Sequence, residues 1–259
     1  MCLLVVAYGL HPRFDLLVGA NRDERHDRAS APLDRWQQFP GLIAGRDLVA
    51  GGSWLGVDAQ GRFASVTNFR DEEATAPGGP SRGGLVTQFL AAGCSPEEYL
   101  TRLAPRAADY AGFNLLLADR ESLWYASNRA PGFARRLPQG VHGLSNHLLD
   151  TPWPKVELSK QGLRGLVDGG GDPLLPLFDL LAEREAPQVA VAGAGATTLP
   201  WPALSGPFIA HEIYGTRCST VVTRDAAVTR INERRFRPLG IADGDTQFQF
   251  ASQPGSVAA

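Results

Sequence analysis

The chain has 259 residues, of which 44% are hydrophobic, 8% aromatic and 20% charged, a composition typical of a soluble globular protein. Its 25 basic and 27 acidic residues leave a net charge of −2, which argues against a binding surface for nucleic acid or for an anionic membrane. No apolar run approaches the roughly 20 residues of a membrane span, and no basic segment precedes the first apolar run as in a secretory signal. The three scattered cysteines are too few for a disulfide framework, so we expect a reduced, cytoplasmic protein.

The first two dozen residues predict a β-hairpin that ends in polar side chains. Two apolar runs, residues 3–8 and 16–20, flank a turn that contains glycine and proline. Because the start of the first strand lies beside the end of the second, Cys2 should lie within reach of the polar residues that follow the second run. The polar residues are Asn21, Arg22, Asp23 and Glu24, and we expect the first three to lie within reach of Cys2.

The next segment alternates between loops and strands. Residues 25–50 show no clear period and are interpreted as a loop with one short strand near residues 41–44. A second hairpin is predicted from the runs at residues 54–58 and 63–68. Residues 70–84 are acidic and then rich in glycine and proline, which indicates a mobile flap over a site.

Two helices should follow this flap. Apolar residues between 85 and 90 fit a 3.6-residue period, with Ser81 as a candidate N-cap. The sequence Ser95-Pro96-Glu97-Glu98 has the serine cap, first-turn proline and acidic third position of a helix start. Strands are then expected at residues 113–118 and 122–126, and a strand end at residues 141–146.

The last part of the chain returns from helices to strands. Residues 155–185 should be helical in two pieces separated by residues 169–173, and residues 186–207 should form a surface loop. A final hairpin is predicted from residues 218–223 and 227–231. Clustered hairpins with inserted helix pairs indicate an α+β fold with antiparallel sheets. We expect a single domain over residues 1–259.

Common catalytic motifs are incomplete in this sequence. The position four residues after His211 is Gly215, so the zinc-protease helix lacks its second histidine. The segment that begins at Gly51 does not match the nucleophile-elbow motif, because its fifth position is Leu55. One glycine-rich segment lacks the lysine of a P-loop, and another lacks the third glycine of a dinucleotide fingerprint. The histidines and cysteines do not have metal-ligand spacing. We therefore predict no metal and no cofactor.

Cys2 is the residue best suited to a catalytic role. If Met1 is removed, Cys2 provides both a thiol nucleophile and an α-amino group whose pKa is ordinarily about 7.7–8, near that of a useful general base. Arg22 would favour the thiolate, and Asp23 could accept a hydrogen bond from the amine. The alternative is a small buried strand residue, with Arg22 and Asp23 forming a local ion pair.

Several motifs together resemble one family. They are Met1-Cys2, Asn21-Arg22-Asp23-Glu24, Gly51-Gly52-Ser53-Trp54-Leu55-Gly56-Val57, Val66-Thr67-Asn68-Phe69-Arg70, Arg82-Gly83-Gly84-Leu85-Val86, Leu144-Ser145-Asn146 and Leu149-Asp150-Thr151-Pro152-Trp153-Pro154-Lys155. In these the chain resembles the NRDE family, also called the transport-and-Golgi-organisation family, from residue 1 to about residue 235. The family resembles in turn the cysteine N-terminal nucleophile (Ntn) hydrolases, which implies a four-layer αββα sandwich of antiparallel sheets.

The resemblance also implies roles for individual residues. It implies that Cys2 is the nucleophile of an enzyme that hydrolyses an amide or related acyl bond in a small molecule. The other catalytic candidates are Arg22 and Asp23, Asn146 as oxyanion donor, and Arg217 as an arginine from late in the chain that faces the nucleophile. The substrate-binding candidates are Asn21 and Asn68.

Structural roles without a part in catalysis stay open for these residues. Asn146 could cap a loop, Arg217 could be a surface charge, and Asn68 could be a turn residue. Trp54 would be a core residue, and residues 234–237 a solvated strand edge. A second function is also implied by the resemblance, namely a non-catalytic carrier of haem or acyl lipid on the same scaffold.

Overall fold

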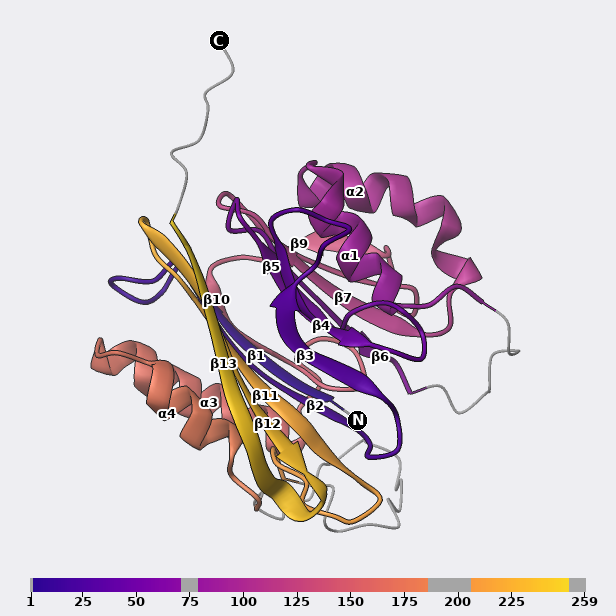
Figure 1. Cartoon of the computed structure of the whole chain (residues 1–259). Coiled ribbons are helices and arrows are strands. Elements are labelled where there is room, and N and C mark those ends of the chain that lie inside the picture. Colours follow the sequence, from indigo (N-terminus) through magenta and orange to yellow (C-terminus); the bar gives the residue numbers. More distant parts are fainter. Residues whose placement is uncertain (1, 71–78, 186–205, 252–259) are drawn as a thin grey trace.

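The computed structural model describes residues 2–70, 79–185 and 206–251. Within them one antiparallel sheet, sheet A, is built around the two N-terminal strands (Figure 1). In spatial order its strands are β10 (Gly140–Leu144), β1 (Cys2–Tyr8), β2 (Leu16–Arg25), β11 (Tyr214–Arg224), β12 (Val228–Arg237) and β13 (Ile241–Ala251). β1 thus lies between β10 and β2, and its first residues, Cys2 and Leu3, pair with β2 alone.

A second antiparallel sheet, sheet B, runs in simple chain order. Its strands are β3 (Ser30–Arg35), β4 (Leu42–Asp47), β5 (Leu55–Asp58), β6 (Phe63–Asn68), β7 (Phe113–Ala118), β8 (Leu123–Ser127) and β9 (Ala134–Arg136). Each neighbouring pair is joined by a short connection except β6 and β7, between which two helices are inserted.

Helices cover the outer face of each sheet. The helices α1 (Gly83–Ala92) and α2 (Pro96–Leu103) pack on sheet B, whereas α3 (Pro154–Gly169) and α4 (Leu174–Leu181) pack on sheet A (Figure 1). Short 3-10 helices, η1 (Ala104–Asp109) and η3 (Pro238–Gly240), lie in connections. The layers are therefore helix, sheet, sheet, helix, which confirms the predicted four-layer αββα sandwich.

Strand alternation divides the apolar residues among three cores. Along β1, Leu4 and Val6 face the core between the two sheets, while Leu3 and Val5 face the core beneath α3 and α4. A further core lies between sheet B and α1 with α2. Burying each such aliphatic side chain contributes about 1.5–3 kcal/mol. The alternation fixes the direction of Cys2, whose side chain shares the inter-sheet face with Leu4.

The first hairpin forms in the predicted register. Cys2 pairs with Arg22 across β1 and β2, and Leu3 pairs with Asn21. Arg22 pairs on its other side with Cys218 of β11. The predicted hairpin is confirmed by this pairing: of the three residues expected near Cys2, namely Asn21, Arg22 and Asp23, it is Arg22 that lies directly opposite.

Two structural predictions in the first third of the chain were wrong. Residues 25–50 contain two strands, because β3 is an exposed edge strand in which only Leu33 is buried and which therefore shows no apolar alternation. Ser81 does not cap α1; the N-cap position is Arg82, and no side chain caps this end. The cap predicted at Ser95 is confirmed, since its side chain accepts a hydrogen bond from the backbone N–H of Glu98.

The C-terminal strands extend beyond the predicted hairpin. β11 and β12 are longer than expected, and β13 was not predicted. The interpretation of residues 234–237 as a strand edge was wrong, because they lie in β12 between β11 and β13. The predicted flap falls largely on residues 71–78 and the predicted surface loop on residues 186–205, which lie outside the described residues. No described helix has the length and apolar character needed to cross a membrane.

Candidate active site

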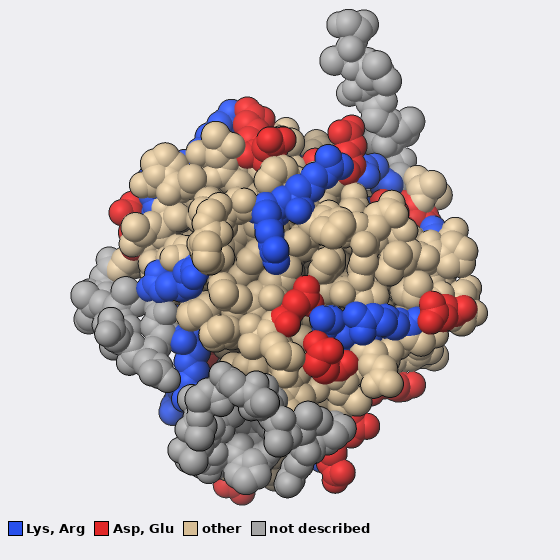
Figure 2. Space-filling view, turned by 180° about the vertical axis from the view of Figure 1, so that it is seen from behind, with Lys and Arg blue, Asp and Glu red and all other residues tan. Residues whose placement is uncertain are grey.

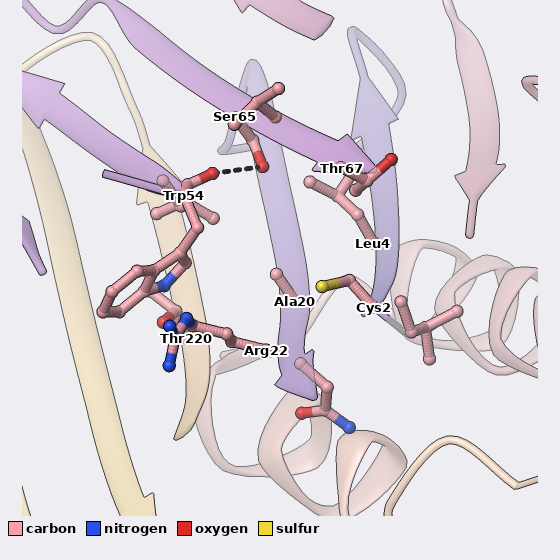
Figure 3. A pocket seen from close by; sticks show the side chains of 12 residues that line it. Cys2, Leu4, Ala20, Arg22, Trp54, Ser65, Thr67 and Thr220 are labelled. Atoms are coloured by element: carbon pink, nitrogen blue, oxygen red, sulfur yellow. Dashed lines mark hydrogen bonds between the residues drawn. The ribbon is translucent and has the colours of Figure 1, made fainter. Parts of the chain in front are cut away.

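The side chain of Cys2 lines a small space between the sheets, here called the inner cavity. Its walls include Cys2, Ala20, Arg22, Trp54, Ser65 and Thr67. Figure 3 shows the sulfur atom turned into this space beside Ala20, with Arg22 and Trp54 on the opposite wall. The inner cavity encloses about 10 Å³, which is room for about one water molecule.

Arg22 and Trp54 form one wall of the inner cavity together. The guanidinium carbon of Arg22 lies 4.3 Å from the centre of the Trp54 ring, a cation–π contact. The ring is held in place because it packs directly against the backbone of Gly45, where a side chain would overlap it. The Nη2 atom of Arg22 lies 3.4 Å from Asp47 Oδ2, and Nη1 is buried with no hydrogen-bond partner among the described residues.

Asn146 lies directly against the backbone of Cys2. Its Oδ1 accepts a hydrogen bond from the backbone N–H of Cys2 at 2.9 Å, and its Nδ2 donates to the backbone carbonyl of Asn68 at 2.8 Å. Next to it, Ser145 Oγ donates to the carbonyl of Cys2 at 2.8 Å. The structure thus brings Cys2, Asn68 and Asn146 together, with Asn68 contributing a carbonyl.

The loop that carries Asn146 is anchored by Asp150. Asp150 has a positive φ of 61° and accepts hydrogen bonds from the backbone N–H of Gly143 and from His142. Lys160 of α3 lies 2.9 Å from the same carboxylate. Burial would raise the pKa of Asp150, but these bonds and the lysine charge lower it to about 2. Asn146 is therefore presented by a fixed loop.

Asn21 and Asp23 point to the opposite face of sheet A from Arg22, as strand alternation requires. The amide of Asn21 donates to the carbonyls of Leu181 and Pro207, both at 2.8 Å, and accepts from Ser219. Its side chain thus fastens the sheet to the helical layer. Asp23 Oδ1 accepts a hydrogen bond from the Thr216 hydroxyl at 2.7 Å.

Lys155 is a residue of this region that was not predicted to belong to the site. It lies in the first turn of α3, is 2% exposed, and interacts electrostatically with Asp23 and Cys2. Burial raises the pKa of Asp23 to about 6, although the charge of Lys155 and the Thr216 hydrogen bond favour the carboxylate. Burial likewise lowers the pKa of Lys155. Lysine is rarely buried without a charged partner, but no local pattern signals such burial.

Arg217 lies in a second, larger space, here called the outer cavity. This cavity encloses about 130 Å³, and its walls include Arg22, Trp54, Arg217, Glu233, Arg235 and Asp243. Arg217 Nη1 donates to the carbonyls of Arg25 and Arg28 at 2.9 and 3.0 Å. Since Arg22 and Trp54 line both cavities, they separate Arg217 from the sulfur of Cys2.

Comparison with known proteins places the chain in a family. The sequence profile of the Transport and Golgi organisation 2 family matches residues 1–238. The Transport and Golgi organization protein 2 homolog of Bos taurus is 31% identical over 253 residues, covering 87% of this chain and 89% of the relative. The Homo sapiens homolog is 32% identical over 248 residues with the same coverage. This chain belongs to the Transport and Golgi organisation 2 family.

Solved structures extend the comparison to the fold. The C2A mutant of conjugated bile acid hydrolase from Clostridium perfringens matches with a TM-score of 0.51 and 9% sequence identity, covering 99% of this chain and 100% of that chain. The likeness shows that this Transport and Golgi organisation 2 family member has an Ntn-hydrolase-like fold. Both the family and the fold resemblance predicted from the motifs are confirmed.

The described residues offer no ready metal site in this family member. No group of three or more histidine, cysteine, aspartate or glutamate side chains within them is arranged to hold a metal ion.

Removing the wall between the two cavities should expose the thiol. We expect Trp54→Ala to raise the rate at which iodoacetamide alkylates Cys2 by at least about tenfold, the ratio that about 1.4 kcal/mol produces. The rate is measured by mass spectrometry of the N-terminal peptide. Cys94 in the same protein serves as an internal reference, since it lies outside both cavity linings. An unchanged ratio of Cys2 to Cys94 alkylation would show that Trp54 does not gate the thiol.

Proposed function

We propose that this protein is a cysteine N-terminal nucleophile hydrolase that cleaves an amide or related acyl bond of a small molecule after removal of Met1. The observation that carries the proposal is the position of Cys2. Its backbone nitrogen is held by Asn146 Oδ1 at 2.9 Å, while its sulfur faces a cavity beside the Arg22 guanidinium. The bile acid hydrolase that shares this fold was solved as its C2A mutant, so that protein also carries a cysteine at position 2.

The mechanism begins with the α-amine that Met1 removal would create. The amine takes the proton of the Cys2 thiol, and the sulfur attacks the carbonyl carbon of the substrate. Collapse of the tetrahedral intermediate breaks the C–N bond, and the leaving nitrogen receives the proton from the amine. A water molecule then attacks the thioester, the amine takes a proton from the water, and the sulfur leaves with that proton as a thiol. Hydrogen bonding to Asn146 would keep the amine in position throughout.

Two groups are suited to stabilise the oxyanion of the intermediate. An amide nitrogen carries two hydrogens, and Asn146 Nδ2 uses one of them for the Asn68 carbonyl. The second hydrogen and the unpartnered Nη1 of Arg22 are the donors we assign to the oxyanion. One such donor contributes about 2.7–4 kcal/mol to transition-state stabilisation. Arg217 is placed further out and would act on a part of the substrate in the outer cavity.

Substitution of the nucleophile tests this function. With a panel of N-acyl amides and acyl thioesters, Cys2→Ala should lower kcat by about 10⁴-fold or more, as expected for loss of a nucleophile. Cys94→Ala is the matched control and should retain the wild-type rate. Hydrolysis that survives in Cys2→Ala would exclude Cys2 as the nucleophile. Binding of haem or an acyl lipid by the wild type and by Cys2→Ala, with no turnover in either, would support the carrier alternative.

A further inference from the structure

The outer cavity brings several charged side chains together. On the face shown in Figure 2, lysine and arginine side chains are scattered among acidic and uncharged ones. The outer cavity brings three arginines, Arg22, Arg217 and Arg235, into one partly open space of about 130 Å³. Glu233 and Asp243 also line it. Its apolar wall includes Trp54 and Phe236 among the lining residues.

Arg22 supplies an unused donor in this space. The residue is 6% exposed, and its Nη1 has no hydrogen-bond partner among the described residues. Leaving a buried cationic donor unsatisfied costs more than leaving a neutral one unsatisfied. The Trp54 ring and Asp47 hold the guanidinium in a fixed orientation where Arg22 lines the outer cavity.

The acidic residues of the cavity offset the charge of its arginines only in part. Glu233 accepts a hydrogen bond from the backbone N–H of Leu33 at 2.9 Å and lies 3.7 Å from Arg235 Nη1. Burial raises the pKa of Glu233. Asp243 is half exposed and pairs with Arg237 at 3.4 Å.

Arg22 and Arg217 repel each other. Burial lowers the pKa of Arg217 and the charge of Arg22 lowers it further, while the negative charges of Glu24 and Asp243 act in the opposite direction. Both guanidinium groups are held in place, Arg22 by Trp54 and Asp47 and Arg217 by two backbone carbonyls. The repulsion between them would be relieved by an anion.

We propose that the outer cavity binds a carboxylate group of a small-molecule ligand, with the guanidinium groups of Arg22, Arg217 and Arg235 as its cationic partners. Three arginines against two carboxylates leave one formal positive charge, which matches a monoanion better than a doubly charged phosphate. The proposal rests on the proposed function in one respect only. If Cys2 is the nucleophile, the substrate is an amide that carries a carboxylate on the Arg22 side of its scissile bond.

Binding is tested on the Cys2→Ala variant, so that turnover plays no part. Isothermal titration calorimetry compares N-acetylglycine, its neutral amide N-acetylglycinamide and the phosphate monoester N-acetyl-O-phosphoethanolamine. We expect the carboxylate to bind at least about tenfold more tightly than the neutral amide, as a charge-assisted pair allows. Equal Kd values for these two would overturn the proposal. Tighter binding of the phosphate than of the carboxylate would overturn the assignment to carboxylate.

Matched variants locate the binding. Arg235→Gln should weaken N-acetylglycine binding about tenfold. The control Arg230→Gln changes an arginine of the same strand that pairs with Asp225 and does not line the cavity, so it should leave Kd unchanged. Asp243→Asn alters a half-exposed side chain and should tighten binding about threefold, within the range of an exposed charge pair.

The results of these binding and activity measurements distinguish the carboxylate-site proposal from the proposed hydrolase function. If Arg235→Gln and Asp243→Asn both leave Kd unchanged, the site is not in the outer cavity. If carboxylate binding follows these variants while the wild type hydrolyses nothing, the site stands and the hydrolase mechanism is rejected. If neutral amides are hydrolysed as fast as carboxylate-bearing ones and N-acetylglycine does not bind, the hydrolase stands and this site is rejected.

Discussion

Replacing Lys155 with methionine is expected to destabilise the protein by about 3–5 kcal/mol at pH 8, the range found when one partner of a buried ion pair is removed. Lys155 is 2% exposed and Asp23 is 3% exposed, so the variant would leave the Asp23 carboxylate buried without this nearby charge. Methionine has a similar length and keeps the apolar contacts of the lysine stem. The loss is measured as the free energy of unfolding by chemical denaturation.

The pH dependence distinguishes lost charge from lost packing. The pKa of Asp23 is raised from 3.8 to about 6 in the folded protein. Between these values the folded state holds this proton more tightly than the unfolded state, so the contribution of Asp23 to stability falls as pH rises through the window. Without Lys155 the folded pKa rises further. The cost of Lys155→Met should therefore be much smaller at pH 4.5 than at pH 8, and an equal cost at both would assign it to packing.

Two further variants complete this test. Lys160→Met removes a buried lysine from the same helix, but its partner Asp150 keeps hydrogen bonds from Gly143 and His142, so the cost at pH 8 should be smaller. Adding Asp23→Asn to Lys155→Met removes both charges and should recover most of the lost stability, since a buried ion pair can be replaced by neutral groups at little cost. No recovery in the double variant would show that the two residues are not coupled.

The sequence predicted the part of the site that depends on local pattern. Two apolar runs around one turn were enough to place Cys2 beside Arg22, because a hairpin with a buried face has one favourable register. The motif with Asn146 was assigned by resemblance, and the fold brings it to the nitrogen of Cys2 across 144 residues. The helix start at Ser95 followed from capping chemistry alone.

The remaining features depend on tertiary packing. Arg22 and Asp23 are adjacent in sequence, and strand alternation sends them to opposite faces, one toward the sulfur and the other toward the helices. The burial of Lys155 depends on the docking of α3 against β1, which no local spacing reveals. β13 was not predicted because its first half is exposed and carries no apolar alternation, and the alternation of Phe248 and Phe250 with glutamines covers only its last residues.

Retention of Met1 is expected to lower hydrolysis by about 10²–10⁴-fold, the contribution of a general base. With Met1 in place, the nitrogen of Cys2 belongs to a peptide bond and cannot take the thiol proton. Its N–H can still donate to Asn146, as it does in this structure, so the fold should be unaffected. The form that retains Met1 therefore lacks the base but keeps the thiol and every other side chain.

Two preparations of the same sequence provide the test. One is produced with methionine aminopeptidase active and the other with it inhibited, and intact mass shows which begins at Cys2 and which at Met1. Equal thermal stability with a large loss of kcat in the Met1 form would support the amine as the base. Equal kcat in the two forms would reject it and leave an external base to activate the thiol. Asp23 could not take this role directly, because strand alternation directs it to the helix side of the sheet, away from the inner cavity that holds the sulfur.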